Sequence, residues 1–352
     1  MPSRRRSAPP EGLCGYPRPM EPLDGVATAG DWYATFAERD ARRTSPVYAD
    51  WAAGISRHPE ILRLIGTLPM EKRQPNLVLG AVRYLGLGPV GFDDLRVFLR
   101  DRWTDVEAVV LRRRTQTNEP GRCATLLPVL ATFDGPLALL EVGASAGLCL
   151  YPDRYSYRYT SPDGSVRLDP VDGPSTVVLD CEWESEPAQA DGLPTTLPEV
   201  VWRAGIDLSP QDVTDRDDLA WLDALIWPGH EARRTRLIDA ASIVAADPPQ
   251  LFAGDLNERL GEVAAQAPHG ARLVVLHSAV LAYLDAPARS RFVAAVQDLD
   301  ATWVSNEGQL VVPGVADRLP PASDAGHRFV LAVDGEPRAL VDPHGASYHP
   351  LG

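Results

Sequence analysis

Residues 139–148, Leu-Leu-Glu-Val-Gly-Ala-Ser-Ala-Gly-Leu, decide the fold that this sequence predicts. The apolar run 137–142 predicts a buried strand, and the two glycines after it predict a tight turn into a helix. A turn of this kind lets a ligand approach backbone N–H groups at a helix N-terminus. We therefore expect a ligand-binding loop formed by Gly143, Ala144, Ser145 and Gly147, with Glu141 beside it.

Two enzyme classes share this pattern. Glu141-x-Gly143-x-Ser145-x-Gly147 resembles the first motif of class I S-adenosylmethionine (SAM) methyltransferases, and its last five residues also match the nucleophile elbow of α/β-hydrolases, with Ser145 as nucleophile. A nucleophile elbow follows several strands and leads into a long helix. Here the upstream residues have helical periodicity, and Pro152 follows soon after the loop. The sequence therefore favours the methyltransferase.

Hydrophobic periodicity divides the chain into three parts. Residues 1–24 are rich in Pro and Arg and predict a disordered arm, and residues 25–134 predict a helical cap. Residues 135–352 predict a class I SAM-methyltransferase-like α/β domain with a doubly wound, mainly parallel sheet, in which residues 152–198 are an insertion. Strands at 328–333 and 338–341 predict a C-terminal antiparallel hairpin across Asp334-Gly335.

Acidic residues at strand ends supply further expected cofactor contacts. Asp207 ends the strand 200–207 and is expected to bind the ribose hydroxyls, as acids do in dinucleotide sites. Asp255 follows the strand 250–254 and is expected near the adenine. The segment between the loop and Asp207 is about 60 residues, against roughly 20 in a compact dinucleotide-binding unit. Asp163 or Asp169 is therefore an alternative ribose ligand.

Polar residues at the ends of two later strands predict the catalytic centre. His277 and Ser278 end the strand that begins at 272, and Asn306 and Glu307 end the next strand. Because the carboxyl ends of parallel strands face the ligand crevice, we expect His277 or Glu307 to act as general base and Asn306 to orient the substrate. The alternative for His277 is a buried structural role.

A second polar cluster precedes the helix that leads to the first strand. Thr117, Asn118 and Glu119 are expected to form a polar roof over the cofactor loop, in contact with substrate together with Ser278. The alternative is that they form the N-cap of the helix, with Glu119 as an acid in its first turn.

Composition limits the partners. The net charge of -14 argues against a nucleic-acid partner, and no apolar run is long enough for a membrane span. The four cysteines form no Cys-x-x-Cys pair, so we expect no metal site, and their low number fits a cytoplasmic protein. The basic run 112–114 predicts a solvated helix face. A small molecule is the expected substrate.

The chain also resembles DUF2332, an actinobacterial family of uncharacterised proteins. The resemblance rests on segments that include 114–119, 141–148, 202–208, 254–256, 277–281 and 303–307. It implies a SAM-methyltransferase-like fold, and relatives of that fold also close amine rings by internal displacement without using SAM. The loop departs from Gly-x-Gly-x-Gly at Ser145, whose side chain would lie where SAM approaches.

Three functions are therefore expected, in order. The first is a SAM-dependent methyltransferase acting on a small molecule. The second keeps the fold without SAM, as an enzyme of internal displacement (an aziridine-type amine cyclisation) or as a non-catalytic binding module. The third is a serine hydrolase.

Overall fold

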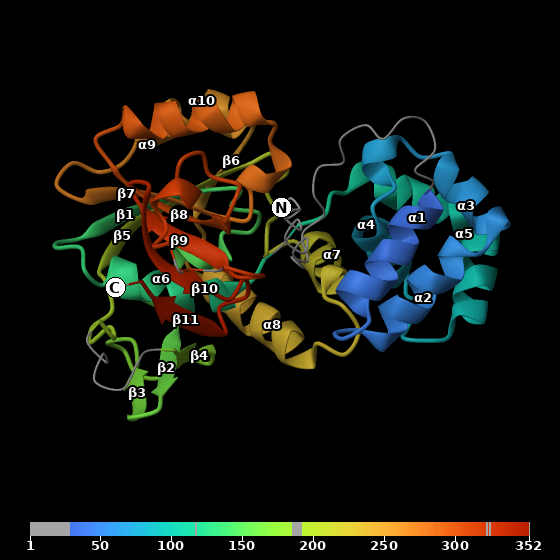
Figure 1. Ribbon diagram of the computed structural model, residues 1–352, viewed down its shortest axis with the longest axis horizontal. Helices are drawn as coiled ribbons and strands as arrows, with labels where there is room; N and C mark the ends of the chain where they lie inside the picture. The colour runs from blue at the N-terminus through green and yellow to red at the C-terminus, as the bar shows by residue number, and fades with distance from the viewer. Residues whose placement is uncertain (1–28, 117, 185–191, 322, 324, 352) are drawn as a thin grey trace, which may run out of the picture.

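The computed structural model describes residues 29–116, 118–184, 192–321, 323 and 325–351. These residues form a helical lobe and a second lobe built on one sheet (Figure 1). The arm expected at residues 1–24 and the roof residue Thr117 lie outside the described residues. In the described part of the chain, no helix combines the length and apolar character needed to cross a bilayer.

Short helices make up the helical lobe. They are α1 (Ala29–Thr35), η1 (Phe36–Ala41), α2 (Pro46–Ser56), α3 (Pro59–Gly66), η2 (Met70–Lys72), α4 (Pro75–Tyr84) and α5 (Phe92–Arg112). Proline at the first position of α2, α3 and α4 fits a helix start, where its missing N–H is no loss. The lobe has its own core, which Trp221 of α7 (Arg216–Leu225) completes.

One mixed sheet spans the other lobe. Its strands are β1 (Leu137–Val142), β2 (Ser156–Ser161), β3 (Gly164–Leu168), β4 (Val178–Trp183), β5 (Val200–Asp207), β6 (Gln250–Ala253), β7 (Arg272–Ser278), β8 (Thr302–Gly308), β9 (Phe329–Val333), β10 (Glu336–Val341) and β11 (Ser347–Pro350). They lie in the order β3-β2-β4-β11-β10-β9-β8-β7-β1-β5-β6, and β6-β5-β1-β7-β8 is parallel throughout. The predicted mainly parallel α/β sheet is thus confirmed.

The direction of strand addition changes at β1. The chain goes from β1 to β5 and β6 on one side, and then returns to β7 and β8 on the other side. This change is the topological switch point of doubly wound sheets, where ligands bind outside the carboxyl ends of the strands. The glycine loop follows β1 directly at this point.

Helices cover both faces of the sheet (Figure 1). On one face, α6 (Cys123–Leu130) and α8 (Glu231–Ala246) share a core with Leu139. On the other face, α9 (Leu256–Ala264) and α10 (Ala286–Gln297) share a core with Leu140. Burial on both faces explains why β1 is an unbroken apolar run up to Glu141.

Both predicted hairpins are present, and the sheet continues further than the sequence indicated. β9 and β10 are antiparallel, and positive φ angles at Asp334 and Gly335 make the tight turn between them. β2 and β3 form the other hairpin. The segment expected as an insertion extends the same sheet, because β4 pairs in parallel with β11, a strand that the sequence analysis missed.

Candidate functional site

The glycine loop is closed by hydrogen bonds within the protein. All five backbone N–H groups from residue 143 to 147 have protein acceptors. These are Ile206 O for Gly143 (2.8 Å) and Ala144 (3.2 Å), Asp207 Oδ2 for Ser145 (2.9 Å), Asn118 Oδ1 for Ala146 (2.9 Å) and Ala144 O for Gly147 (2.7 Å). A loop that binds phosphate or carboxylate leaves such donors for its ligand. In this structure none of the five is available.

Two amide side chains hydrogen-bond the hydroxyl group of Ser145. Its Oγ donates to Oε1 of Gln116 and accepts from Nδ2 of Asn118. The residue is buried, and its φ of 51° is unusual for a side chain other than glycine. The predicted helix after the loop is only the short η4 (Leu148–Leu150). Among the described residues, no histidine contacts the hydroxyl, so the arrangement gives the hydrolase no support.

Close packing explains the glycine at 143. A Cβ atom there would lie 2.4 Å from a methyl carbon of Val280, and φ is 73°. The space over this glycine, where a cofactor would pass, holds the side chain of Val280 from the loop after β7.

The strand-end acids have structural partners. Asp207 bonds the N–H groups of Ser145 and Ser209, and Asp255 accepts from the N–H of Asn257 as the N-cap of α9. The alternatives Asp163 and Asp169 flank β3, which β7, β8, β9, β10, β11, β4 and β2 separate from β1. That alternative is therefore wrong, and only Asp207 lies at the loop.

Glu141 lies at the carboxyl end of β1 in a nearly closed environment. Its Oε2 has no hydrogen-bond partner among the described residues. Burial raises the pKa of this carboxyl well above its usual value, the neighbouring Cys149 raises it further, and Arg122 opposes the shift.

His277 and Glu307 form a fully buried pair. His277 Nδ1 lies 2.8 Å from Glu307 Oε1, which also accepts the N–H groups of Val280 (2.9 Å) and Leu281 (3.0 Å). The imidazole packs edge-on against Phe292 and stacks on Trp303, under α10. These contacts support the alternative for His277, a buried structural role. His277 Nε2 and Glu307 Oε2 have no hydrogen-bond partner among the described residues.

Ser278 and Asn306 form a second pair on the opposite face. Asn306 Nδ2 donates to Ser278 Oγ at 3.1 Å, and Arg122 donates to the carbonyl of Ser278. Side chains alternate along a strand, so these residues point away from His277 and Glu307. The three predicted catalytic residues and the predicted substrate contact Ser278 therefore make two separate buried pairs.

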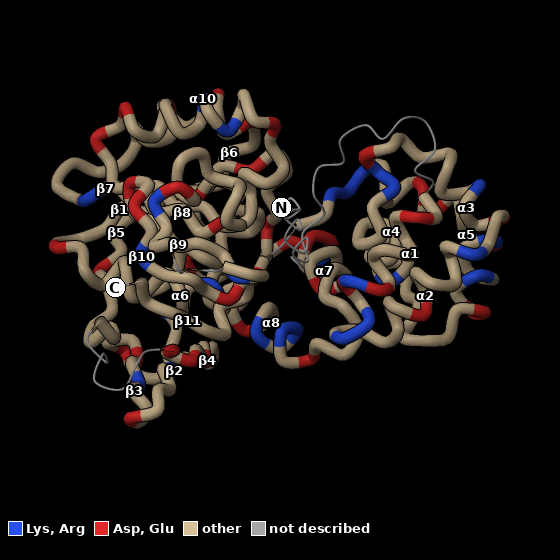
Figure 2. Tube along the Cα trace, in the orientation of Figure 1, with Lys and Arg blue, Asp and Glu red and all other residues tan. Residues whose placement is uncertain are grey.

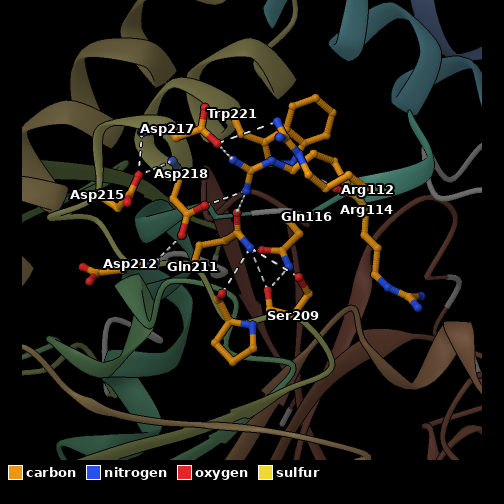
Figure 3. A network of polar contacts seen from close by, with 12 residues as sticks. Arg112, Arg114, Gln116, Ser209, Gln211, Asp212, Asp215, Asp217, Asp218 and Trp221 are labelled. Carbon is orange, nitrogen blue, oxygen red and sulfur yellow. Dashed lines mark hydrogen bonds and ion pairs between the residues drawn. The ribbon is translucent and has the colours of Figure 1, made fainter. Parts of the chain in front are cut away.

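Residues 113–116, 118 and 119, which we call the strap, lie between the two lobes, and Gln116 and Asn118 of the strap cover the glycine loop. Arg113 begins it and is buried, although the sequence predicted a solvated face. Its guanidinium donates to Asp218 (2.5 Å), Gln211 (3.2 Å) and Asp217. Figure 3 shows Gln211, Asp217, Asp218 and Trp221 converging beside the strap. Arg113 also lies over the Trp221 ring, 5.9 Å from its centroid.

A cavity of about 350 Å³ lies between the lobes, on the other side of the strap from the loop. Its walls come from segments far apart in the sequence. They are η1 with Arg39 and Asp40, the start of α4, the strap with Gln116 and Asn118, the end of α7 through the start of α8, and the β10–β11 turn with His344. Of these wall residues, the sequence predicted a ligand contact only for Asn118.

The family model described as "Uncharacterized protein conserved in bacteria (DUF2332)" matches residues 30–349. The chain belongs to the DUF2332 family. No curated protein and no solved structure gives a match. No group of three or more His, Cys, Asp or Glu side chains suited to a metal ion occurs within the described ranges of this DUF2332 protein.

Two ionisable groups that border the cavity of this DUF2332 protein, Asp40 and His344, have shifted pKa values. Burial raises the pKa of Asp40 to about 6, against the effect of Arg39. Desolvation and the positive charges of Arg233 and Arg122 lower the pKa of His344 although much of the residue is exposed to solvent, so its imidazole is neutral at pH 7. The cavity thus carries an acid that titrates near neutral pH and a neutral imidazole.

Glu119 is the N-cap residue of η3 (Pro120–Arg122) rather than an acid in its first turn, and it also connects α8 to the strap. It accepts the N–H of Gly121, and it forms ion pairs with Arg233 (2.6 Å) and Arg236 (2.9 Å). Burial alone would raise its pKa, but the two arginines outweigh burial and hold the pKa below its usual value. Asn118 thus bonds the glycine loop, and Glu119 caps η3.

Proposed function

We propose that the chain binds and acts on a small molecule in the cavity between the lobes, and that it does not use SAM as a methyl donor. The observation that carries this proposal is that the glycine loop is closed to a ligand by contacts within the protein. Its five N–H donors are bonded within the protein, Val280 covers Gly143, and an open cavity lies next to it across the strap.

Internal displacement is the reaction that fits the cavity best. An amine nitrogen of the substrate would attack a carbon of the same molecule, and the leaving group would depart with the bonding electron pair. A base must then take the proton from nitrogen. Asp40 borders the cavity, and its pKa of about 6 suits a base near neutral pH. Arg233 borders it too and would stabilise a departing anion.

SAM-dependent methyl transfer is the second candidate, and the sheet favours it. The order of strand addition reverses at β1, and Glu141 and Asp207 lie at the carboxyl ends of two strands where a SAM-binding site would need acids. In this alternative the strap must move, because the side chains of Gln116 and Asn118 are hydrogen-bonded to the glycine loop. His277 or Glu307 would then have to reach a substrate from a buried pair.

Calorimetric titration with SAM separates the two proposals. We expect no saturable heat at millimolar SAM for the wild-type chain. Saturable binding with one SAM per chain would overturn the cofactor-independent proposal. The Asn118→Ala variant is the matched test of a latent site, because it frees the N–H of Ala146; binding only in this variant would show that the strap excludes SAM. Wild-type Ser145 labelled by a fluorophosphonate, with loss of the label in Ser145→Ala, would instead support the hydrolase.

A further inference from the structure

The start of α4 lies beside the end of α7, because the two helices pack in opposite directions. At the end of α4, the ring of Tyr84 packs edge-on against Trp221. One turn earlier, Gly80 leaves the room that Leu225 needs, since a Cβ atom there would lie 2.9 Å from a methyl carbon of Leu225. Asn76, the second residue of α4, therefore borders the same cavity as Leu225.

The carboxamide of Asn76 is not bonded within the protein as the other carboxamides of the cavity are. Its Oδ1 is buried and has no hydrogen-bond partner among the described residues. By contrast, Gln116 and Asn118 bond the glycine loop, and Gln74 accepts from Thr115 Oγ1 at 3.2 Å. A buried acceptor without a partner costs free energy, so a donor on a bound molecule would stabilise this wall.

The charged side chains of the cavity wall balance. They are Arg39, Arg233, Asp40 and Asp342. Arg233 already pairs with Glu119 at 2.6 Å, and the imidazole of His344 is neutral at pH 7. Figure 2 shows residues of both charges along α7 and α8, which supply one wall. With neither charge in excess, the wall favours an uncharged polar group on the ligand.

We propose that the ligand of this cavity carries an uncharged group with an N–H and a C=O side by side, as in a primary carboxamide, a lactam or a ureido group, and that this group pairs with the carboxamide of Asn76. This inference rests on the proposed function and names its ligand class. The ligand N–H donates to Oδ1 of Asn76, and Nδ2 donates to the ligand carbonyl. The apolar part of the ligand packs on Leu225 and Trp227 of the adjoining wall.

Three probes of nearly the same shape test this pairing. Benzamide carries both the N–H and the C=O, acetophenone carries only the C=O, and benzoate is an anion at pH 7. Each is titrated into the full chain at pH 7 with detection of the ligand by NMR. We expect benzamide to bind about ten-fold more tightly than either of the others, because neither acetophenone nor benzoate can donate to Asn76 Oδ1.

Variants at two amides of the same wall locate the group. Asn76→Leu should weaken benzamide by about ten-fold and remove its preference over acetophenone. Gln74→Met is the matched control, since Gln74 also borders the cavity but its amide is bonded to Thr115 and to the carbonyl of Glu71. This variant should leave the affinity for benzamide nearly unchanged.

Stability without ligand separates a ligand contact from a structural one. Because Asn76 Oδ1 has no partner in the described part of the chain, Asn76→Leu should unfold at the same temperature as wild type or at a higher one. A marked fall in the unfolding temperature would mean that the protein already bonds this amide, and would overturn the inference.

The binding outcomes separate this inference from the function on which it rests. Equal binding of benzamide and acetophenone, tighter binding of benzoate, or equal effects of Asn76→Leu and Gln74→Met overturn the amide site and leave the cavity as a ligand site. Failure of all three probes to bind contradicts the cavity as a small-molecule site as well.

Discussion

The side chain of Asn118 bonds the glycine loop at two points, donating to Ser145 Oγ and accepting from the N–H of Ala146. A single amide thereby takes one backbone donor of the loop and fixes the residue that replaces its middle glycine. This contact joins the strap to the loop. A loop whose sequence pattern predicts ligand binding is therefore hydrogen-bonded to the protein itself.

Gln116 and Asn118 should stabilise the chain as one unit, because both bond Ser145 Oγ. Each alanine variant leaves a buried partner unsatisfied, which costs about 1–3 kcal/mol in unfolding free energy. We expect the double variant to lose less than the sum of the single losses, by about 0.5 kcal/mol or more. Urea denaturation of the four proteins measures this difference. Strictly additive losses would mean that the strap and the loop are not coupled through Ser145.

The basic run 112–114 offers a matched pair of substitutions. Arg113→Met removes a buried guanidinium from two carboxylates and should cost about 3 kcal/mol of unfolding free energy, as when a buried ion pair is broken. Arg112→Met removes a mostly exposed side chain and should cost less than about 0.5 kcal/mol. Equal losses in urea denaturation would show that the buried ion pairs of Arg113 add no more stability than the exposed contact of Arg112.

Two buried glutamates should have opposite effects on the pH dependence of stability. The folded pKa of Glu119 is lowered, so its contribution is present above about pH 4.3, the ordinary glutamate pKa, and is lost as the pH falls through the lower folded value. We expect Glu119→Gln to be less stable than wild type by about 2 kcal/mol at pH 7, with a smaller difference in acid.

The folded pKa of Glu141 is raised, so the sign is reversed for this residue. Wild-type stability should fall relative to Glu141→Gln as the pH rises above about 4.3. Urea denaturation from pH 4 to 8 measures both variants. Parallel curves for wild type and Glu141→Gln would contradict the raised pKa.

Glu307 should act mainly as a structural anchor. Glu307→Ala leaves the N–H groups of Val280 and Leu281 and the imidazole of His277 without their acceptor, at a cost of about 2–4 kcal/mol. Glu336→Ala is the control, since Glu336 is an exposed partner of Arg318 and should change little. Thermal unfolding compares the two; a stable Glu307→Ala protein would return Glu307 to the catalytic candidates.

The sequence predicted most of the sheet lobe, because its signals are local. β1 and β5 begin and end at the predicted residues, and the tight turn between β9 and β10 lies at Asp334-Gly335, as predicted. β11 was missed, since it is four residues long and its partner β4 is far away in the sequence.

The candidate site could be predicted only in part. Asn118 was expected over the loop, and its side chain bonds the loop in the structure. This could be predicted because Asn118 comes shortly before α6, the helix that leads to β1 and the loop. The cavity could not be predicted, since its walls meet only through the packing of the two lobes. Strand ends correctly placed His277 and Ser278 at one edge of the sheet, but alternation along the strand sends them to opposite faces.

The location of a bound small molecule tests the central claim most directly. Crystals of the full chain would be soaked in a fragment library that includes both adenosine-like compounds and aromatic carboxamides. We predict electron density in the cavity between the lobes, with carboxamide groups at Asn76, and an unchanged glycine loop. Adenosine-like density against Gly143–Gly147, with Asn118 displaced and the cavity empty, would contradict the account.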